Sequence, residues 1–290
     1  MALGGVDLDA HAGEVVAVLG PNGSGKSSLL RLLATASPLQ AGSLELLGEP
    51  AGPRAALRRR IGFAGDAPVH PGALTARECV ALLGRASGLA AADAAARGAA
   101  MLERVGLAAD AEAPVASVSL GMRRRLMIAE TLVHRPGLIL LDEPTLGLDP
   151  DGLDALARLL AAAVAAGAAA VVASNDVGFA ARVATRVTFL RRSLVVGEGT
   201  PSALLAQVGA EAVVAVELAA PARRPLRPPP GVRLVEQGEA RLTARVPAGA
   251  GVLPALLRAV EEAGASVRGV AVREPDLSDV FRALTGETLA

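Results

Sequence analysis

Residues 20–28 constrain the fold more than any other part of the chain. They read Gly-Pro-Asn-Gly-Ser-Gly-Lys-Ser-Ser and fit the pattern G-x-x-x-x-G-K-[ST]. The apolar run at 15–19 predicts a buried strand before them, and residues 28–33 predict an apolar helix after them. In such a unit, glycines let backbone N–H groups surround phosphate oxygens at the helix N-terminus. The segment therefore predicts a phosphate-binding loop between a strand and a helix.

Two side chains of this loop suit a nucleotide with bound Mg²⁺. Lys26, the only lysine in the chain, would reach the terminal phosphates, and the Ser27 hydroxyl would ligate the metal. The other interpretation is a glycine-rich turn that carries a lysine by chance, which the flanking strand and helix disfavour. The residues expected to bind the nucleotide here are Gly20, Pro21, Asn22, Gly23, Ser24, Gly25, Lys26, Ser27 and Ser28.

The composition limits the remaining possibilities. The chain has 290 residues, which fits one or two domains, and is 52% hydrophobic, which is ample for a core. Its formal net charge is zero, so no overall field indicates nucleic acid as a partner. Its single cysteine excludes an internal disulfide and favours a reducing compartment. Neither a signal peptide nor a membrane span is visible, so we expect a chain that is soluble alone.

The longest uncharged run, 159–175, contains Gly167 and is better explained as a helix followed by a strand. Residues 73–134 are expected to be almost wholly helical, with Thr75 capping a helix and Glu78 completing a capping box.

Two carboxylates follow the apolar residues 138–141. A strand buried on both faces is typical of a parallel sheet, and ligands bind at the carboxyl ends of such strands. Asp142 would hold Mg²⁺ directly or through water, and Glu143 would polarise the attacking water. An ordinary strand followed by an acidic turn is the alternative, which the phosphate-loop motif upstream disfavours.

Residues 141–150, Leu-Asp-Glu-Pro-Thr-Leu-Gly-Leu-Asp-Pro, resemble the Walker B motif and D-loop of ABC-type ATPases. Residues 118–126, Val-Ser-Leu-Gly-Met-Arg-Arg-Arg-Leu, resemble the signature loop of that family. The resemblance covers residues 1 to about 210 and implies an α/β fold of the P-loop NTPase (ABC ATPase) type with a helical subdomain. It also implies that Ser119, Gly121 and Asp149 serve nucleotide held between two subunits. Without the other motifs, 119–122 would be read as a helix cap.

The sequence departs from the family pattern at three places. The aromatic residue that usually stacks on adenine is missing, since the chain has no Tyr or Trp; either the start is truncated or apolar contacts hold the base.

Asp66 stands at the position of the Q-loop glutamine, where it could bind Mg²⁺ or its water but repels phosphate. Asn175 stands at the position of the switch histidine, where it can hydrogen-bond the γ-phosphate but carries no proton. A plain turn residue is the other interpretation of Asn175. We therefore expect weak or partner-dependent hydrolysis.

The C-terminal part, 211–290, is expected to form a small α+β accessory or docking domain, with a ferredoxin-like arrangement as one candidate. The proline- and arginine-rich residues 221–230 predict an extended connection, either solvated or in contact with anionic lipid or a partner. Residues 273–286 resemble the tail of ATPases from ABC-2-type exporters, including the drug-resistance group. Asp276 is expected to cap the last helix and Phe281 to anchor it.

These patterns predict an ATPase subunit that binds ATP and Mg²⁺ and powers an exporter. Its expected partners are a separate transmembrane permease and a second ATPase chain, in a homodimer or a heterodimer, with no nucleic acid. Its expected place is the cytoplasmic face of the cell membrane. A regulatory nucleotide-binding subunit that hydrolyses poorly is the main alternative. An ABC ATPase acting on nucleic acid or ribosomes, and a small-molecule kinase, explain fewer of the motifs.

Overall fold

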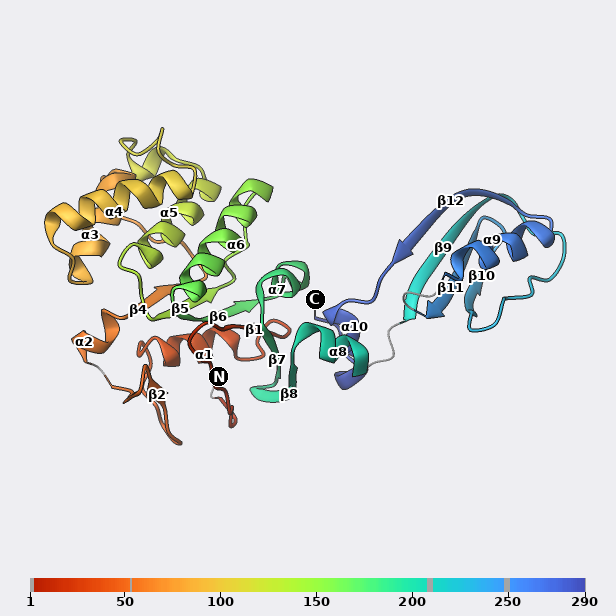
Figure 1. Ribbon diagram of the computed structural model, residues 1–290, viewed down its shortest axis with the longest axis horizontal. Coiled ribbons are helices and arrows are strands. Elements are labelled where there is room, and N and C mark those ends of the chain that lie inside the picture. Colours follow the sequence, from red (N-terminus) through yellow and green to blue (C-terminus); the bar gives the residue numbers. More distant parts are fainter. Residues whose placement is uncertain (1–2, 53, 208–210, 248–250, 290) are drawn as a thin grey trace. The chain divides into compact units, whose positions relative to one another are not determined.

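The structure is a computed structural model, and it describes residues 3–52, 54–207, 211–247 and 251–289. Contacts divide the chain into two compact units, Met1–Pro201 together with Glu287–Ala290, and Ser202–Gly286. This division falls earlier in the chain than the expected domain boundary at 210/211, and it assigns the last four residues to the first unit. Figure 1 shows the elements of each unit in sequence colours.

The first unit is built on a six-stranded sheet in the order β4-β5-β6-β1-β7-β8. All neighbouring strands are parallel except β7 and β8, which form an antiparallel hairpin. The strands are β1 Val15–Leu19, β4 Ile61–Ala64, β5 Leu138–Asp142, β6 Ala169–Ser174, β7 Arg186–Arg191 and β8 Leu194–Gly199. The predicted strands at 15–19 and 138–141 are confirmed.

Helices cover both faces of this sheet. Alternate residues of β5 serve two cores: Ile139 and Leu141 pack with Leu156 and Leu160 of α6 (Pro150–Ala165). Leu138 and Leu140 instead pack with residues of α1 (Lys26–Leu33). Because both faces are covered, every residue of β1, β5 and β6 is buried. The predicted helix end at Gly167 is also confirmed, since this glycine has a φ of +95°.

The helical subdomain contains α3 (Ala76–Ala86), α4 (Ala91–Arg104) and α5 (Leu120–Leu132). Thr75 and Glu78 form the expected capping box at the start of α3. The expectation that 73–134 is almost wholly helical is wrong for 105–119, where only the short 3₁₀ helix Val115–Ser117 occurs. Gly106, at a φ of +72°, ends the α4 region, and Pro114 cannot continue an α-helix.

Shorter elements complete the first unit. A short hairpin pairs β2 (Glu45–Leu46) with β3 (Glu49–Pro50). Leu47 and Gly48 form the turn with positive φ, which suits a two-residue hairpin loop. The remaining helices are α2 Ala55–Arg58 and α7 Val177–Val183.

The second unit contains an antiparallel sheet in the order β10-β11-β9-β12. Three strands precede its helix α9, and one follows. A ferredoxin-like β-α-β-β-α-β arrangement has a helix after its first strand, and here β9 is joined to β10 without one, so that candidate is met only in part. The elements are α8 Pro201–Gln207, β9 Glu211–Ala220, β10 Arg233–Gln237, β11 Arg241–Pro247, α9 Leu253–Glu262, β12 Ser266–Arg273 and α10 Leu277–Thr285.

Both expectations for the last helix are confirmed. Asp276 caps α10 in a capping box with Asp279, and Phe281 is fully buried. Among the helices of the described residues, none combines the length and the apolar character needed to cross a bilayer.

Candidate functional site

The phosphate loop joins the end of β1 to the start of α1. Gly23 and Gly25 have φ of +79° and +109°, a region that residues with a Cβ rarely adopt. A Cβ on Gly20 would lie 2.1 Å from the carbonyl oxygen of Leu190 in β7. The glycines are therefore required by backbone conformation at two positions and by close packing at the third. The loop so formed presents the N-terminus of α1, a site that favours anions.

Lys26 lies at the centre of a polar network and is only 5% exposed. Its Nζ donates to the Gly20 carbonyl at 2.6 Å and to Asn175 Oδ1 at 2.8 Å, and lies 3.7 Å from Glu143 Oε1. Burial lowers the pKa of Lys26, and the charges of Glu143 and Asp142 oppose this shift. The lysine is thus held where it would meet phosphate oxygens, by groups that a phosphate can replace.

Asp142 ends β5 and is 1% exposed. Neither of its carboxylate oxygens has a hydrogen bond of good geometry to the described part of the chain. Burial raises the pKa of Asp142, and the nearby Ser27 hydroxyl offsets this only in part. A buried carboxylate with unused oxygens, next to a hydroxyl, fits a Mg²⁺ ligand.

Within the described ranges, no three His, Cys, Asp or Glu side chains gather into a metal cluster. Mg²⁺ does not require one, since it is commonly held by one or two carboxylates, waters and substrate phosphates.

Glu143 follows directly, in a strained conformation with a φ of +45°. Its Oε2 accepts from the backbone N–H of Asn175 at 3.1 Å and from the Ser174 hydroxyl at 3.4 Å. The turn thus directs the carboxylate toward Lys26 instead of continuing along β5. This position suits a group that orients a water toward a phosphate held by Lys26.

Asn175 follows β6 and bridges three parts of this site. Its Oδ1 accepts from Lys26, its Nδ2 donates to Asn22 Oδ1 at 2.8 Å, and its backbone N–H is bonded to Glu143. The structure therefore brings Asn175 to the site, although its role as a switch residue stays a prediction. We call the loop 20–28 with Asp142, Glu143 and Asn175 the phosphate-loop site.

Asp66 lies just after β4, and its side chain is 61% exposed. Its carboxylate lies 4.0 Å from Arg31 on α1, and its backbone carbonyl accepts from Arg124. Asp66 is thus near α1 but not yet within the buried network of Lys26. Its role in metal binding stays a prediction.

Ser119, Gly121 and Asp149 lie together at a second place in the first unit, which we call the signature surface. They line a surface hollow of about 440 Å³. Ser119 caps α5 by accepting from the Met122 N–H at 3.2 Å, and Asp149 caps α6 by accepting from Gly152 at 2.9 Å. The hydrogen bond from Arg125 lowers the pKa of Asp149. Two helix N-termini therefore face the same hollow, which suits an anionic partner group.

Two arginines that tie distant segments of the first unit together were not predicted. Arg124 is 5% exposed and donates to the Leu146 carbonyl at 3.1 Å and to the Gly65 carbonyl at 3.5 Å. It thereby ties the segment after β4 to the segment after Glu143. In the sequence it stands within a run of three arginines, and nothing there separates it from its neighbours.

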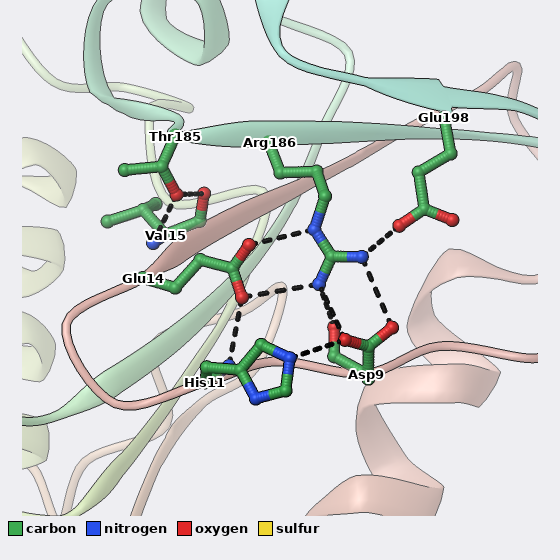
Figure 2. Close-up of polar contacts among 7 residues, drawn as sticks. All are labelled: Asp9, His11, Glu14, Val15, Thr185, Arg186 and Glu198. Carbon is green, nitrogen blue, oxygen red and sulfur yellow. Dashed lines mark hydrogen bonds and ion pairs between the residues drawn. The ribbon is translucent and has the colours of Figure 1, made fainter.

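Arg186 is the second, and Figure 2 shows its network. Its Nε donates to Glu14 at 2.8 Å, and its guanidinium also pairs with Asp9 and Glu198. The hydrogen bonds that Arg186 donates to Glu14 and Asp9 raise the pKa of Arg186. Because Glu14 precedes β1, Arg186 fixes the start of β1 against β7. Glu14 and Asp9 are 172 and 177 residues away from Arg186 in sequence, so no local pattern could have indicated their part of the network.

Comparison with known proteins agrees with this geometry. The family model described as ABC transporter matches residues 3–146. The daunorubicin resistance ATP-binding protein DrrA3 of Streptomyces coeruleorubidus is 36% identical, over 99% of this chain and 92% of that protein. The doxorubicin resistance ATP-binding protein DrrA of Mycobacterium tuberculosis is 31% identical, over 98% of this chain and 88% of that protein.

Solved structures are similar as well. The ATP-binding subunit of an ABC transporter has a TM-score of 0.66 at 29% identity, over 70% of this chain and 85% of that one. A dimeric ATP-binding cassette in a post-hydrolysis state with ADP and phosphate has a TM-score of 0.63 at 26% identity, over 67% of this chain and 88% of that one. The chain belongs to the ATP-binding proteins of ABC transporters, and it is an ATPase of that family.

Proposed function

We propose that this chain hydrolyses MgATP to drive a separate ABC-2-type permease that exports drug-like compounds. The observation that carries the proposal is the placing of Asp142 and Glu143 beside Lys26, at the carboxyl ends of parallel strands. The drug class comes from the names of the relatives, which are daunorubicin and doxorubicin resistance proteins. Specificity for the cargo would lie in the permease.

The chain's own residues suffice for positioning the substrate. The amides of the phosphate loop would bind the β- and γ-phosphates, and Lys26 would exchange its bond to Asn175 for a phosphate oxygen. Glu143 would orient the attacking water and accept its proton. Ser27 and Asp142 would hold Mg²⁺, which supplies charge neutralisation on the phosphates.

A second ATPase chain would complete the site. The signature surface offers a hydroxyl and two helix N-termini to an anion, but it holds neither a lysine nor the Glu143 carboxylate. We infer that it meets the nucleotide bound at the phosphate-loop site of a second copy, or of a homologous chain, as in a dimer that encloses two nucleotides. Closure of that dimer would move the permease between its two states, and hydrolysis would reset it.

We also infer that the protein works at the cytoplasmic face of the membrane, attached through its permease. The helical subdomain supplies apolar side chains for this contact, since Leu82 and Leu83 of α3 are 49% and 40% exposed. Exposed apolar residues that lie together on one element are suited to a protein partner.

The second candidate is a regulatory subunit that closes on ATP but hydrolyses it slowly. Asn175 favours this candidate, because its amide bonds Lys26 and Asn22 but cannot shuttle a proton. Glu143 opposes it, because the group that activates water is present and correctly turned.

ATP turnover over a series of protein concentrations tests these candidates. The variants are Glu143→Gln and, as a matched control, Glu112→Gln, an exposed carboxylate paired with Arg77. We expect turnover that rises more steeply than protein concentration, survives Glu112→Gln and falls by about 100-fold or more in Glu143→Gln. Tight ATP binding without turnover at any concentration would support the regulatory candidate. Turnover that is unaffected by Glu143→Gln would overturn the proposed mechanism.

A further inference from the structure

The turn between β7 and β8 supports the phosphate loop from behind. The backbone N–H of Ser193 donates to the Ser24 carbonyl at 2.8 Å. A Cβ on Gly25 would lie 3.1 Å from the Ser193 hydroxyl oxygen, and a Cβ on Gly20 would collide with the Leu190 carbonyl. The phosphate loop therefore packs against residues 190–193, and a movement of this segment would move the loop.

This turn is the two-residue loop of the β7–β8 hairpin. Arg192 and Ser193 both have positive φ, +48° and +64°, as this kind of hairpin loop requires, although neither is glycine. Ser193 is 3% exposed and bonded to the phosphate loop, so the turn is fixed to that loop on one side. On its other side the turn follows directly from Arg191, the last residue of β7.

Glu287 holds the start of this turn. Its Oε2 accepts from Arg191 Nε at 2.9 Å, its Oε1 accepts from Arg191 Nη2, and Oε1 lies 3.6 Å from Arg192 Nη2. The contact with Arg191 is bidentate, which fixes direction as well as distance. Hydrogen bonding to Arg191 lowers the pKa of Glu287, so the carboxylate stays ionised at neutral pH. Leu289, two residues further on, is 5% exposed and secures the segment.

We propose that the Glu287–Arg191 pair is a positioning device for the nucleotide site, acting through the β7–β8 turn on the phosphate loop. Glu287 is 96 residues from Arg191 in sequence. It holds Arg191, which precedes the turn, and the turn is bonded to Ser24 and lies close against Gly25. The pair sets how well the loop amides are arranged before ATP arrives, and so affects affinity more than the chemical step.

Equilibrium binding of a fluorescent ATP analogue to the full chain tests this device. The Glu287→Gln variant keeps size and shape but loses the charge, and Arg191→Gln removes the other partner. The matched control is Asp154→Asn, which breaks the exposed Arg182–Asp154 pair between α6 and α7. We expect the Kd to rise about two- to five-fold in Glu287→Gln and to stay unchanged in the control.

A double-mutant cycle makes the test specific. If Glu287 acts through Arg191, then Glu287→Gln in an Arg191→Gln background weakens binding no further. In steady-state hydrolysis, KM rises by the same factor and kcat is unchanged. A Kd equal to that of the wild type, or additive effects of the two changes, would overturn the proposal. So would a lowered thermal unfolding midpoint with unchanged Kd, since that would mean a purely structural ion pair.

The inference rests on nucleotide binding at the phosphate-loop site, and its failure is distinguishable from failure of the proposed function. A wild-type chain that binds the analogue without hydrolysing it would overturn the function as a transport ATPase. The Kd comparison would still decide the role of Glu287.

Discussion

The phosphate-loop site and the signature surface differ in how their polar groups are satisfied. At the phosphate-loop site, Lys26 is buried and bonded to groups of three separate segments, from Gly20, Glu143 and Asn175. At the signature surface, Ser119 and Asp149 are exposed and bonded mainly to the first turns of their own helices and to Arg125. The first place is organised by long-range contacts, and the second by local caps.

This difference indicates whether each of the two sites requires groups from a second chain. Long-range contacts hold the phosphate-loop site ready within one chain, so a single copy can bind nucleotide. The signature surface has a hollow and two helix N-termini but lacks the groups that grip a phosphate tightly. Under the proposed function, one chain contributes two unlike halves, and we expect two chains to put unlike halves together.

The largest effect on ATP turnover is expected from mixing two inactive variants. Lys26→Ala removes the phosphate-binding lysine, and Ser119→Asp keeps a good helix cap while adding a charge that repels phosphate. Each variant alone is expected to lose about 100-fold or more of its ATP turnover. In a mixed dimer, one of the two sites combines an intact loop with an intact signature surface. Mixing equal amounts should therefore restore about a quarter of the wild-type turnover.

Controls for this experiment use the same two variants at the same total concentration, unmixed. Failure of the mixture to exceed the sum of its components would mean that both halves act within one chain. A restored activity above that of the wild type would point to contamination, so each variant is purified separately and assayed before mixing.

The next effect concerns Asn175, which belongs to the phosphate-loop site but brings no proton-carrying group. Asn175→His introduces a side chain with an ordinary pKa near 6.5, so turnover should rise about ten-fold. A new pH dependence is expected around that value, because only one form of the ring suits the γ-phosphate. The measurement is kcat from pH 5.5 to 8.5 in both proteins. Unchanged turnover with an unchanged pH profile would remove Asn175 as the cause of slow hydrolysis.

The sequence predicted the phosphate-loop site better than the surroundings that hold it. Lys26 and Glu143 stand in motifs whose spacing along the chain is itself informative. Arg124 lies in the signature-like segment, but nothing there separates it from Arg123 and Arg125, and Arg186 stands in no motif. The partners of both arginines come from strands and loops that only the folded sheet brings near. The ferredoxin-like expectation is met only in part, because the proline-rich connection from β9 to β10 contains no helix.

A smaller effect is expected from Asp142→Asn on the free energy of unfolding. Burial raises the pKa of Asp142, so the ionised form is penalised in the folded nucleotide-free protein. A carboxyl group whose pKa is higher in the folded state than in the unfolded state destabilises the protein at pH values above the ordinary pKa. This destabilisation disappears as the pH falls below the ordinary pKa. The amide should therefore stabilise the protein by about 1–2 kcal/mol at pH 7 and by little at pH 4.

Chemical denaturation at both pH values measures this difference. The control is Asp151→Asn in the first turn of α6, a charge change at an exposed position. If the variant is less stable than the wild type at pH 7, the Asp142 carboxylate has hydrogen-bond partners in the folded chain. Its oxygens would then not be free to bind a metal.

The smallest effect concerns Ser119, whose hydroxyl caps α5 in the single chain. Ser119→Ala should lower the free energy of unfolding by about 1 kcal/mol, as should Thr75→Ala at the start of α3. Neither change should alter the Kd of an ATP analogue for the dilute single chain, because the signature surface is not part of the phosphate-loop site. At concentrations that support turnover, only Ser119→Ala should slow hydrolysis, since Thr75 faces no nucleotide. Weaker ATP binding by the dilute Ser119→Ala chain would mean that the signature surface affects the phosphate-loop site within one chain. The contrast between these two parts of the molecule would then no longer hold.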